Sequence, residues 1–128
     1  MATLADLART HTDLDDEDIG LLQDLSSTWG LLADLSFADL LLFGRRDGEL
    51  RGPLVLLGHV RPTTGTTLYR ADLVGQVFES SRRPLATAAF DTGSTTAGTV
   101  SVGTDRDVDV VAIPVRRSGR TVGVVVRE

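Results

Sequence analysis

Few side chains in this sequence are suited to bond-making chemistry. The chain has neither cysteine nor lysine, which excludes thiolate nucleophiles, cysteine metal sites and Schiff-base catalysis. Its serines lie outside any G-x-S-x-G turn of the kind that exposes a hydrolase nucleophile. The acidic residues Asp105, Asp107 and Asp109 approach and enter a predicted strand, where alternation places them on the solvent side rather than in an acid–base pair. We therefore predict that this segment is not an enzyme.

The two histidines are the remaining reactive groups. His11 lies in a charged turn between predicted helices and is interpreted as a surface residue. His59 ends an apolar strand beside a threonine-rich loop, so we interpret it either as a structural residue or as a polar contact to a ligand. Axial haem ligation by His59 is a third alternative that no other feature supports. We predict no metal site and no cofactor.

Charge and hydropathy argue against two classes of partner, nucleic acids and membranes. The net charge is −5, and the arginines occur as pairs (Arg45/Arg46, Arg82/Arg83, Arg116/Arg117) rather than as a stripe, which argues against nucleic-acid binding. The start of the chain lacks the features of a signal peptide, and no apolar run approaches the roughly 20 residues that span a bilayer. We expect a cytoplasmic domain that does not enter a membrane.

Two helices are predicted at the N-terminus. Thr3 is a suitable N-cap for a short first helix, and the acidic run Asp15–Asp18 is favoured at the start of a second one by the helix dipole. An apolar stripe at helical spacing continues along the second helix through Ile19, Leu22, Leu25, Trp29 and Leu32. We expect this stripe to pack on a sheet. A second apolar face, made of Leu21, Leu31 and Leu35, is left for a partner helix.

Strand patterns begin where the helical spacing ends. The run Leu40–Phe43, followed by turn residues, predicts a strand over 39–46. An Asp47-Gly48 turn then leads into a second strand over 50–61, in which Pro53 indicates an irregular start. Both faces of the second strand are expected to be at least partly covered.

The second half of the chain is predicted to hold one short helix and a hairpin. Pro84 begins a helix that Gly93 ends, and the Gly/Ser/Thr-rich stretch 92–103 is either a mobile segment or a weak edge strand. Strands over 108–115 and 122–126 pair around a Ser118-Gly119 turn. Pro114 cannot donate to a ladder, so it should mark a bulge or a position whose partner is missing.

Four stretches together resemble one protein family. They are STWGLLADLSFADLLL at 27–42, RPTT at 61–64, DLVG and RPL between 72 and 85, and AIPVRR with GRTVGV between 112 and 124. In this order they resemble the N-terminal sensory segment of a group of cytosolic bacterial sensor histidine kinases. The first and last stretches are the more specific.

The resemblance implies an α+β fold, a GAF-like antiparallel sheet with N-terminal helices packed on one face and a short helix on a connection. It implies one sensory domain over 1–128, with helices in 1–36 and the sheet in 37–128. It also implies a PAS domain and an ATP-binding kinase core downstream, outside this chain, and phosphorelay to an ANTAR-type response regulator. Without cysteine, this copy cannot attach a bilin as GAF photoreceptors do.

The expected function is regulatory input to a two-component kinase. A small-molecule ligand is expected between the sheet and the connections 61–75 and 93–105, and its identity and its effect on the kinase are left open. The candidate contacts are Phe37, Phe43, Leu57, His59, Arg61, Thr64, Tyr69 and Phe78. Tyr69 and Phe78 also have an alternative interpretation as core residues, and for these two the core interpretation is preferred. The alternative function is a ligand-free interaction module that forms a homodimer through the N-terminal helices.

Overall fold

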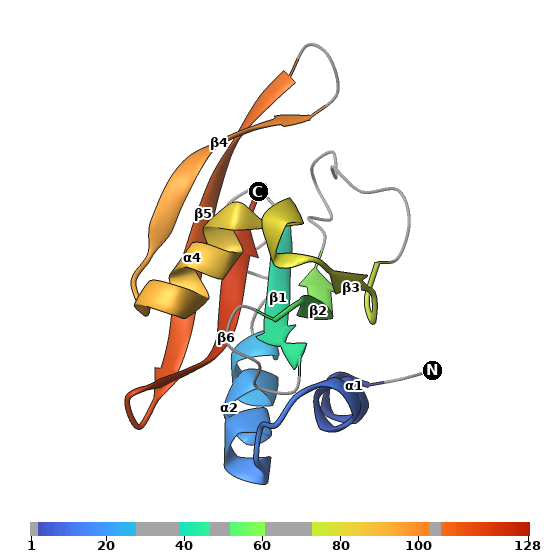
Figure 1. Cartoon of the computed structure of the whole chain (residues 1–128). Helices are drawn as coiled ribbons and strands as arrows, with labels where there is room; N and C mark the ends of the chain where they lie inside the picture. Colours follow the sequence, from blue (N-terminus) through green and yellow to red (C-terminus); the bar gives the residue numbers. More distant parts are fainter. Residues whose placement is uncertain (1–2, 28–38, 47–51, 61–72, 103–105) are drawn as a thin grey trace.

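The computed structural model describes residues 3–27, 39–46, 52–60, 73–102 and 106–128. Within them, six strands form one antiparallel sheet in the order β3-β2-β1-β6-β5-β4 (Figure 1). The strands are β1 (Leu40–Arg45), β2 (Leu54–Val60), β3 (Val77–Phe78), β4 (Thr96–Val102), β5 (Arg106–Arg117) and β6 (Arg120–Arg127). The helical elements are α1 (Leu4–His11), α2 (Asp16–Ser26), the 3₁₀ helix η2 (Ser80–Arg82) and α4 (Pro84–Thr92).

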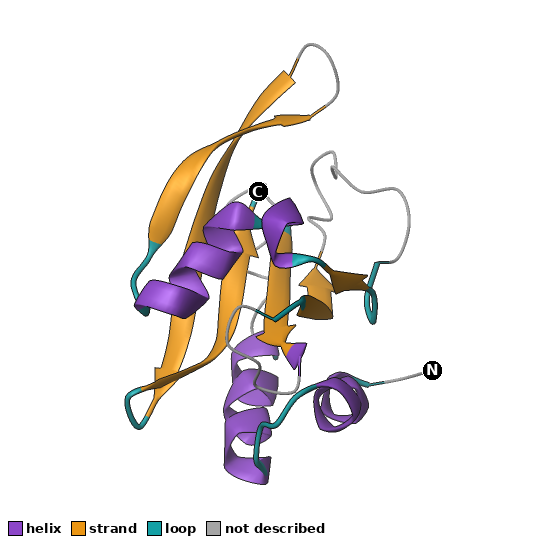
Figure 2. Cartoon of the chain, viewed as in Figure 1, coloured by secondary structure: helices purple, strands orange, loops and turns teal. Residues whose placement is uncertain are grey.

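Helices cover the sheet from both sides. Helices α1 and α2 pack on one face, and α4 packs on the other, over β4, β5 and β6 (Figure 2). The α+β class and the GAF-like arrangement that the resemblance implied are therefore confirmed. None of the described helices is both long and apolar enough to cross a membrane. The predicted division at residues 36 and 37 falls in a segment outside the described residues and stays a prediction.

The two N-terminal helices begin where the polar residues predicted. Thr3 caps α1 in a reciprocal capping box with Asp6, and Asp15 caps α2 in the same way with Asp18. Each box satisfies backbone N–H groups that the first helical turn leaves unpaired. The acidic run is thus a helix start, and it positions α2 with its apolar stripe toward the sheet.

The predicted stripe on α2 packs as expected over its described part. Ile19 and Leu22 are fully buried against the sheet, and Leu25 is partly buried beside them. Leu21, on the second face, is 36% exposed. The remaining members of both faces, Trp29, Leu31, Leu32 and Leu35, lie outside the described residues.

The central strands have both faces buried. In β1, Leu40 and Leu42 point toward α1 and α2, whereas Leu41 and Phe43 point toward α4. In β2, all of Leu54–Leu57 is buried, which confirms that both faces of this strand are covered. The Asp47-Gly48 turn that was predicted between these strands lies outside the described residues.

A bulge in β2 decides which face its last residues occupy. Leu42 pairs with Gly58 and Phe43 pairs with Leu56, so Leu57 has no partner of its own in β1. Beyond the bulge, His59 is directly opposite Leu41. Residues opposite one another share a face of the sheet, so His59 lies on the α4 face.

The second half of the chain follows its predicted pattern with two refinements. Gly93 ends α4 in the left-handed region, at φ +68°, and the stretch after it is the edge strand β4. Pro114 pairs with Val124 of β6, but the described β4 stops pairing at Ala112. Pro114 therefore lies where one side of β5 has no described strand partner, and the bulge of this hairpin comes between Val115 and Arg116.

Candidate ligand-binding site

A cavity of about 80 Å³ lies on the α4 face. It is open on one side and is bordered by η2, the first turn of α4, three strands of the sheet and the last residue of the chain. Its lining residues are Arg82, Arg83, Pro84, Leu85, Ala86, Val100, Val110, Val126 and Glu128. Val100 belongs to the 93–105 connection that was predicted to border a ligand.

Small residues bring α4 close to the sheet and leave this space. Ala86 and Ala89 are the buried residues of α4, and Ala86 lines the cavity. Gly98 of β4 lies under Leu85, where an added Cβ would be 3.4 Å from the leucine methyl carbons. The helix therefore sits on the sheet through short side chains, and its first turn is open to a small guest.

Arg83 and Glu128 form an ion pair in the cavity wall. Arg83 Nη1 lies 2.8 Å from Glu128 Oε1, and the two side chains are 17% and 6% exposed. The Arg83 guanidinium is also 5.2 Å from the ring centroids of Phe43 and Phe78, which are themselves in an edge-to-face contact. The arginine is therefore held by two aromatic faces as well as by a carboxylate.

Asp39 and His59 have buried polar side chains next to the Arg83–Glu128 pair, beyond the lining of the cavity. The backbones of Asp39 and Glu128 exchange two hydrogen bonds, of 2.8 and 3.0 Å, which continue the β1–β6 ladder by one pair. His59 Nε2 is 3.9 Å from Asp39 Oδ2, and both side chains are almost inaccessible. Because Asp39 alternates with Leu40, its side chain belongs to the α4 face, as those of His59 and Glu128 do.

The predicted contact residues separate into three groups. Phe43, His59 and Phe78 all lie on the α4 face, at the end that holds Arg83. Leu57 lies on the opposite face, in the cluster with α1 and α2, because it precedes the change of face at the bulge. It does not join the others. The remaining candidates, Phe37, Arg61, Thr64 and Tyr69, lie outside the described residues.

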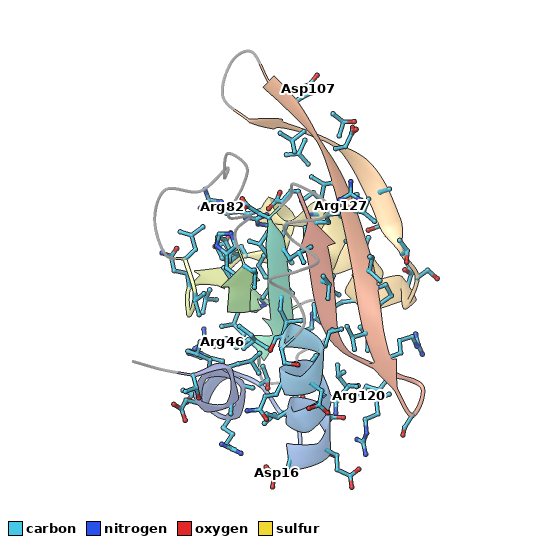
Figure 3. All side chains as sticks on the ribbon, turned by 180° about the vertical axis from the view of Figure 1, so that it is seen from behind. Asp16, Arg46, Arg82, Asp107, Arg120 and Arg127 are labelled. Atoms are coloured by element: carbon cyan, nitrogen blue, oxygen red, sulfur yellow. The ribbon has the colours of Figure 1, made fainter. Side chains whose placement is uncertain are left out.

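The charged residues of the cavity were not among the predicted contacts. Arg83 carried one signal, because it directly precedes the proline that begins α4 and is thereby placed at the helix entrance. Glu128 carried none, since its partner lies 45 positions away in the sequence. Figure 3 shows Arg82 and Arg127 in the half of the molecule that ends at Asp107, and Arg120 and Asp16 in the opposite half.

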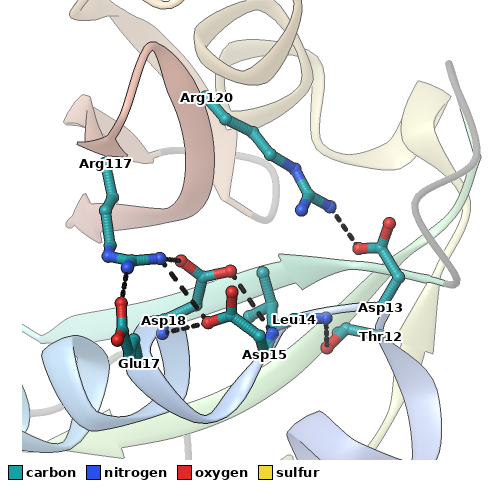
Figure 4. Close-up of polar contacts among 8 residues, drawn as sticks. All are labelled: Thr12, Asp13, Leu14, Asp15, Glu17, Asp18, Arg117 and Arg120. Atoms are coloured by element: carbon teal, nitrogen blue, oxygen red, sulfur yellow. Dashed lines mark hydrogen bonds and ion pairs between the residues drawn. The ribbon is translucent and has the colours of Figure 1, made fainter.

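A second charged cluster lies in that opposite half and ties α2 to the β5–β6 hairpin (Figure 4). Arg117 Nη1 lies 2.7 Å from Asp18 Oδ1 and 3.5 Å from Asp15 Oδ1. Arg117 also pairs with Glu17, and Arg120 pairs with Asp13. Within the described ranges, no group of three or more histidines and acidic residues is placed to hold a metal ion. We interpret this cluster as a brace between helix and hairpin.

Comparison with known proteins agrees with this architecture. A family model for the GAF domain of the histidine kinase PdtaS matches residues 4–128. The sensor histidine kinase PdtaS of Mycolicibacterium smegmatis is 37% identical over all of this chain, and that of Mycobacterium tuberculosis is 43% identical over 73% of it. The chain spans 26% and 18% of the length of these two relatives.

A solved structure supports the same family assignment. The sensor region of a sensor histidine kinase superimposes with a TM-score of 0.76 at 36% identity, over 99% of this chain and 42% of the other. The chain belongs to the family of GAF domains of the histidine kinase PdtaS, and it is a regulatory input domain without a catalytic role of its own.

Proposed function

We propose that this domain senses a small molecule in the cavity at the start of α4 and passes its occupancy to the kinase parts of a longer, cytoplasmic protein. The observation that carries the proposal is the Arg83–Glu128 pair in the cavity wall. A concave site with apolar walls and a few convergent polar groups is the usual form of a small-molecule site. The α4-face cavity has this form and lies on the face that carries three of the predicted contacts, which supports the proposal.

In this proposal, the end of strand β6 transmits the occupancy of the cavity to the rest of the protein. Glu128 follows the last residue of β6, and its backbone is paired with Asp39 at the entry to β1. A ligand that prefers one arrangement of Arg83 and Glu128 would shift the population of this strand end by its difference in affinity. In the full protein, we place a PAS domain and a histidine-kinase core after this strand, and an ANTAR-type response regulator as the receiver of the phosphate.

A thermal-shift screen of the 128-residue chain against nucleotides and metabolites tests the proposal. A compound present at 100 times its Kd stabilises the fold by about 2.7 kcal/mol, which raises the melting temperature by several degrees. Ala86→Val fills part of the cavity and should abolish the shift. Ala89→Val is the matched control, since Ala89 is buried on the same helix but does not line the cavity.

Overpacking either alanine can lower stability by itself. Val100→Trp therefore serves as a second blocking variant, because Val100 lines the cavity and is 38% exposed. A panel in which no compound raises the melting temperature would contradict ligand sensing at this site. If a compound still raises the melting temperature of both blocking variants, it binds at a place other than this cavity.

Homodimerisation through the N-terminal helices is the second candidate function. The supporting observation is Leu21, a leucine that is 36% exposed on the outer side of α2. Sedimentation velocity across concentrations, on the wild-type chain and on Leu21→Glu, measures it. A dimer that the substitution dissociates supports this function, and a monomer at all concentrations contradicts it for the 128-residue chain.

A further inference from the structure

Cationic residues outnumber acidic ones among the described residues that line the α4 cavity. Arg82 and Arg83 are cationic, Glu128 is acidic, and the other lining residues are apolar. The net charge of the whole chain is −5, so this local excess of arginine runs against its overall charge. A ligand with a negative charge would complement it.

Arg82 is the guanidinium that a guest can reach first. Its side chain is exposed, and no described residue forms a hydrogen bond or ion pair with it. Arg83 is less adjustable, because it lies over Phe43 and Phe78 and is paired with Glu128. The planar fork of an arginine matches a carboxylate through two parallel N–H donors. Two arginines at one cavity thus favour a carboxylate ligand.

The volume and the walls limit the rest of the ligand. A cavity of roughly 150 Å³ lined by apolar residues accommodates benzene. The present space, about 80 Å³, is roughly half as large, and its floor is made by Val110 and Val126 with Leu85 above them. A short hydrocarbon tail fills such a space. A second carboxylate on the ligand would lie against these apolar walls, where a charge without a partner is costly.

We infer that this cavity binds a small monocarboxylate with a short apolar tail, whose carboxylate pairs with Arg82 and competes with Glu128 for Arg83. The inference rests on the proposed ligand site and names its ligand class. Because aromatic rings hold Arg83, the exchange displaces Glu128 rather than the arginine. Binding thereby changes the side chain that follows β6, which is the part of the site nearest to the proposed output.

Butyrate and butyramide are matched probes, because they share a tail and differ in charge. Isothermal titration and thermal shift of the 128-residue chain should show millimolar or tighter binding of butyrate, and at least tenfold weaker binding of butyramide. Arg82→Gln should weaken butyrate at least tenfold. The matched control is Arg127→Gln, an equal change of charge at an exposed residue opposite Leu40, on the α1/α2 face. It should stay within twofold of wild type.

The competition with Glu128 has its own readout. Glu128→Gln removes the competing charge and should tighten butyrate binding at least threefold; an unchanged or weaker affinity overturns the competition. If this variant is unstable, the backbone amide NMR signal of Glu128 in the unmodified chain gives the answer. That signal should shift with butyrate and not with butyramide, and a signal that butyrate leaves in place overturns the displacement of Glu128.

The experiments distinguish a failure of the inferred ligand class from a failure of the proposed ligand site. Equal binding of butyrate and butyramide, lost in Ala86→Val, overturns the carboxylate class and leaves the ligand site standing. The same holds if butyrate fails and an uncharged compound from the screen binds in the cavity. If neither the carboxylates nor the screen yields a compound that Ala86→Val blocks, both the inference and the ligand site fall.

Discussion

The two faces of this sheet are built from the same strands but packed in different ways. On the α1/α2 face, large side chains of α2 such as Ile19 and Leu22 reach strand residues such as Leu42 and Val122. On the α4 face, the helix contributes Ala86 and a second alanine, and a cavity remains beside them. Because β1 alternates strictly between the faces, the helices and not the strands make the difference.

The ion pairs of the two faces also differ, in how deeply they are buried. Arg117 lies at the rim of the α1/α2 face and pairs with several acidic side chains, two of which are largely exposed. Arg83 lies within the α4 face and pairs with the buried side chain of Glu128. Exposed pairs contribute little to stability, whereas removal of one partner of a buried pair is strongly destabilising, because the other charge is left without compensation. The buried pair of the α4 face is therefore sensitive to any group that competes for one of its partners, as the proposed ligand would.

The largest expected effect tests whether the α1/α2 face is the stabilising one. Leu22→Ala should lower the free energy of unfolding by about 3 kcal/mol, because a fully buried leucine is removed from a closely packed layer. Urea unfolding measures it. Leu21→Ala, the exposed neighbour, is the control and should cost less than about 1 kcal/mol. Equal losses would mean that α2 does not pack through this stripe.

Two valines of β6, one on each face of the sheet, allow a direct comparison of how tightly the two faces are packed. Val122 and Val126 are both buried, the first against α2 and the second in the cavity wall. Val122→Ala should cost about 2 kcal/mol, and Val126→Ala about half of that, because the cavity already leaves one side of Val126 without contacts. Chemical denaturation of both variants checks the order. A larger loss at Val126 would contradict the looser packing of the α4 face.

Local features of this fold were predictable from the sequence. The helix starts at Thr3 and Asp15 and the helix end at Gly93 depend on residues within four positions, and all three were expected and are present. The buried run of β1 was also expected, since an apolar stretch followed by turn residues needs no distant partner to be recognised.

The site was less predictable, because it depends on distant partners. Nothing within β2 indicates that pairing with β1 leaves Leu57 in a bulge, yet this decides that His59 faces α4 and Leu57 does not. Arg83 and Glu128 are neighbours only because β6 lies beside β1 and α4 crosses above it. The aromatic candidates Phe43 and Phe78 were named from their places in the sequence, but their contact with Arg83 depends on the fold.

The brace between α2 and the hairpin should have a moderate, salt-dependent effect. Arg117→Gln removes the cation beside the buried carboxylate of Asp18 and should cost about 1 kcal/mol, a value reduced by the 31% exposure of the Arg117 side chain. Arg120→Gln breaks an exposed pair with Asp13 and should cost about 0.3 kcal/mol. Denaturation at low and high salt measures both. A loss at Arg117 that does not shrink in high salt would argue against an electrostatic brace.

The smallest expected effect is at the start of α1, at the far edge of the α1/α2 face. Hydrogen bonding of the Asp6 carboxylate with Thr3, to its backbone N–H first and to its side chain second, holds the pKa of Asp6 below its ordinary value of 3.8. A carboxyl whose pKa is lower in the folded state stabilises the fold above pH 3.8 and loses that contribution as the pH falls through the folded value. The melting-temperature advantage of wild type over Asp6→Asn should therefore shrink between pH 6 and pH 2. Thr3→Ala, which removes only the side-chain partner, should raise the Asp6 pKa seen by NMR, and an unchanged titration would place the cause elsewhere.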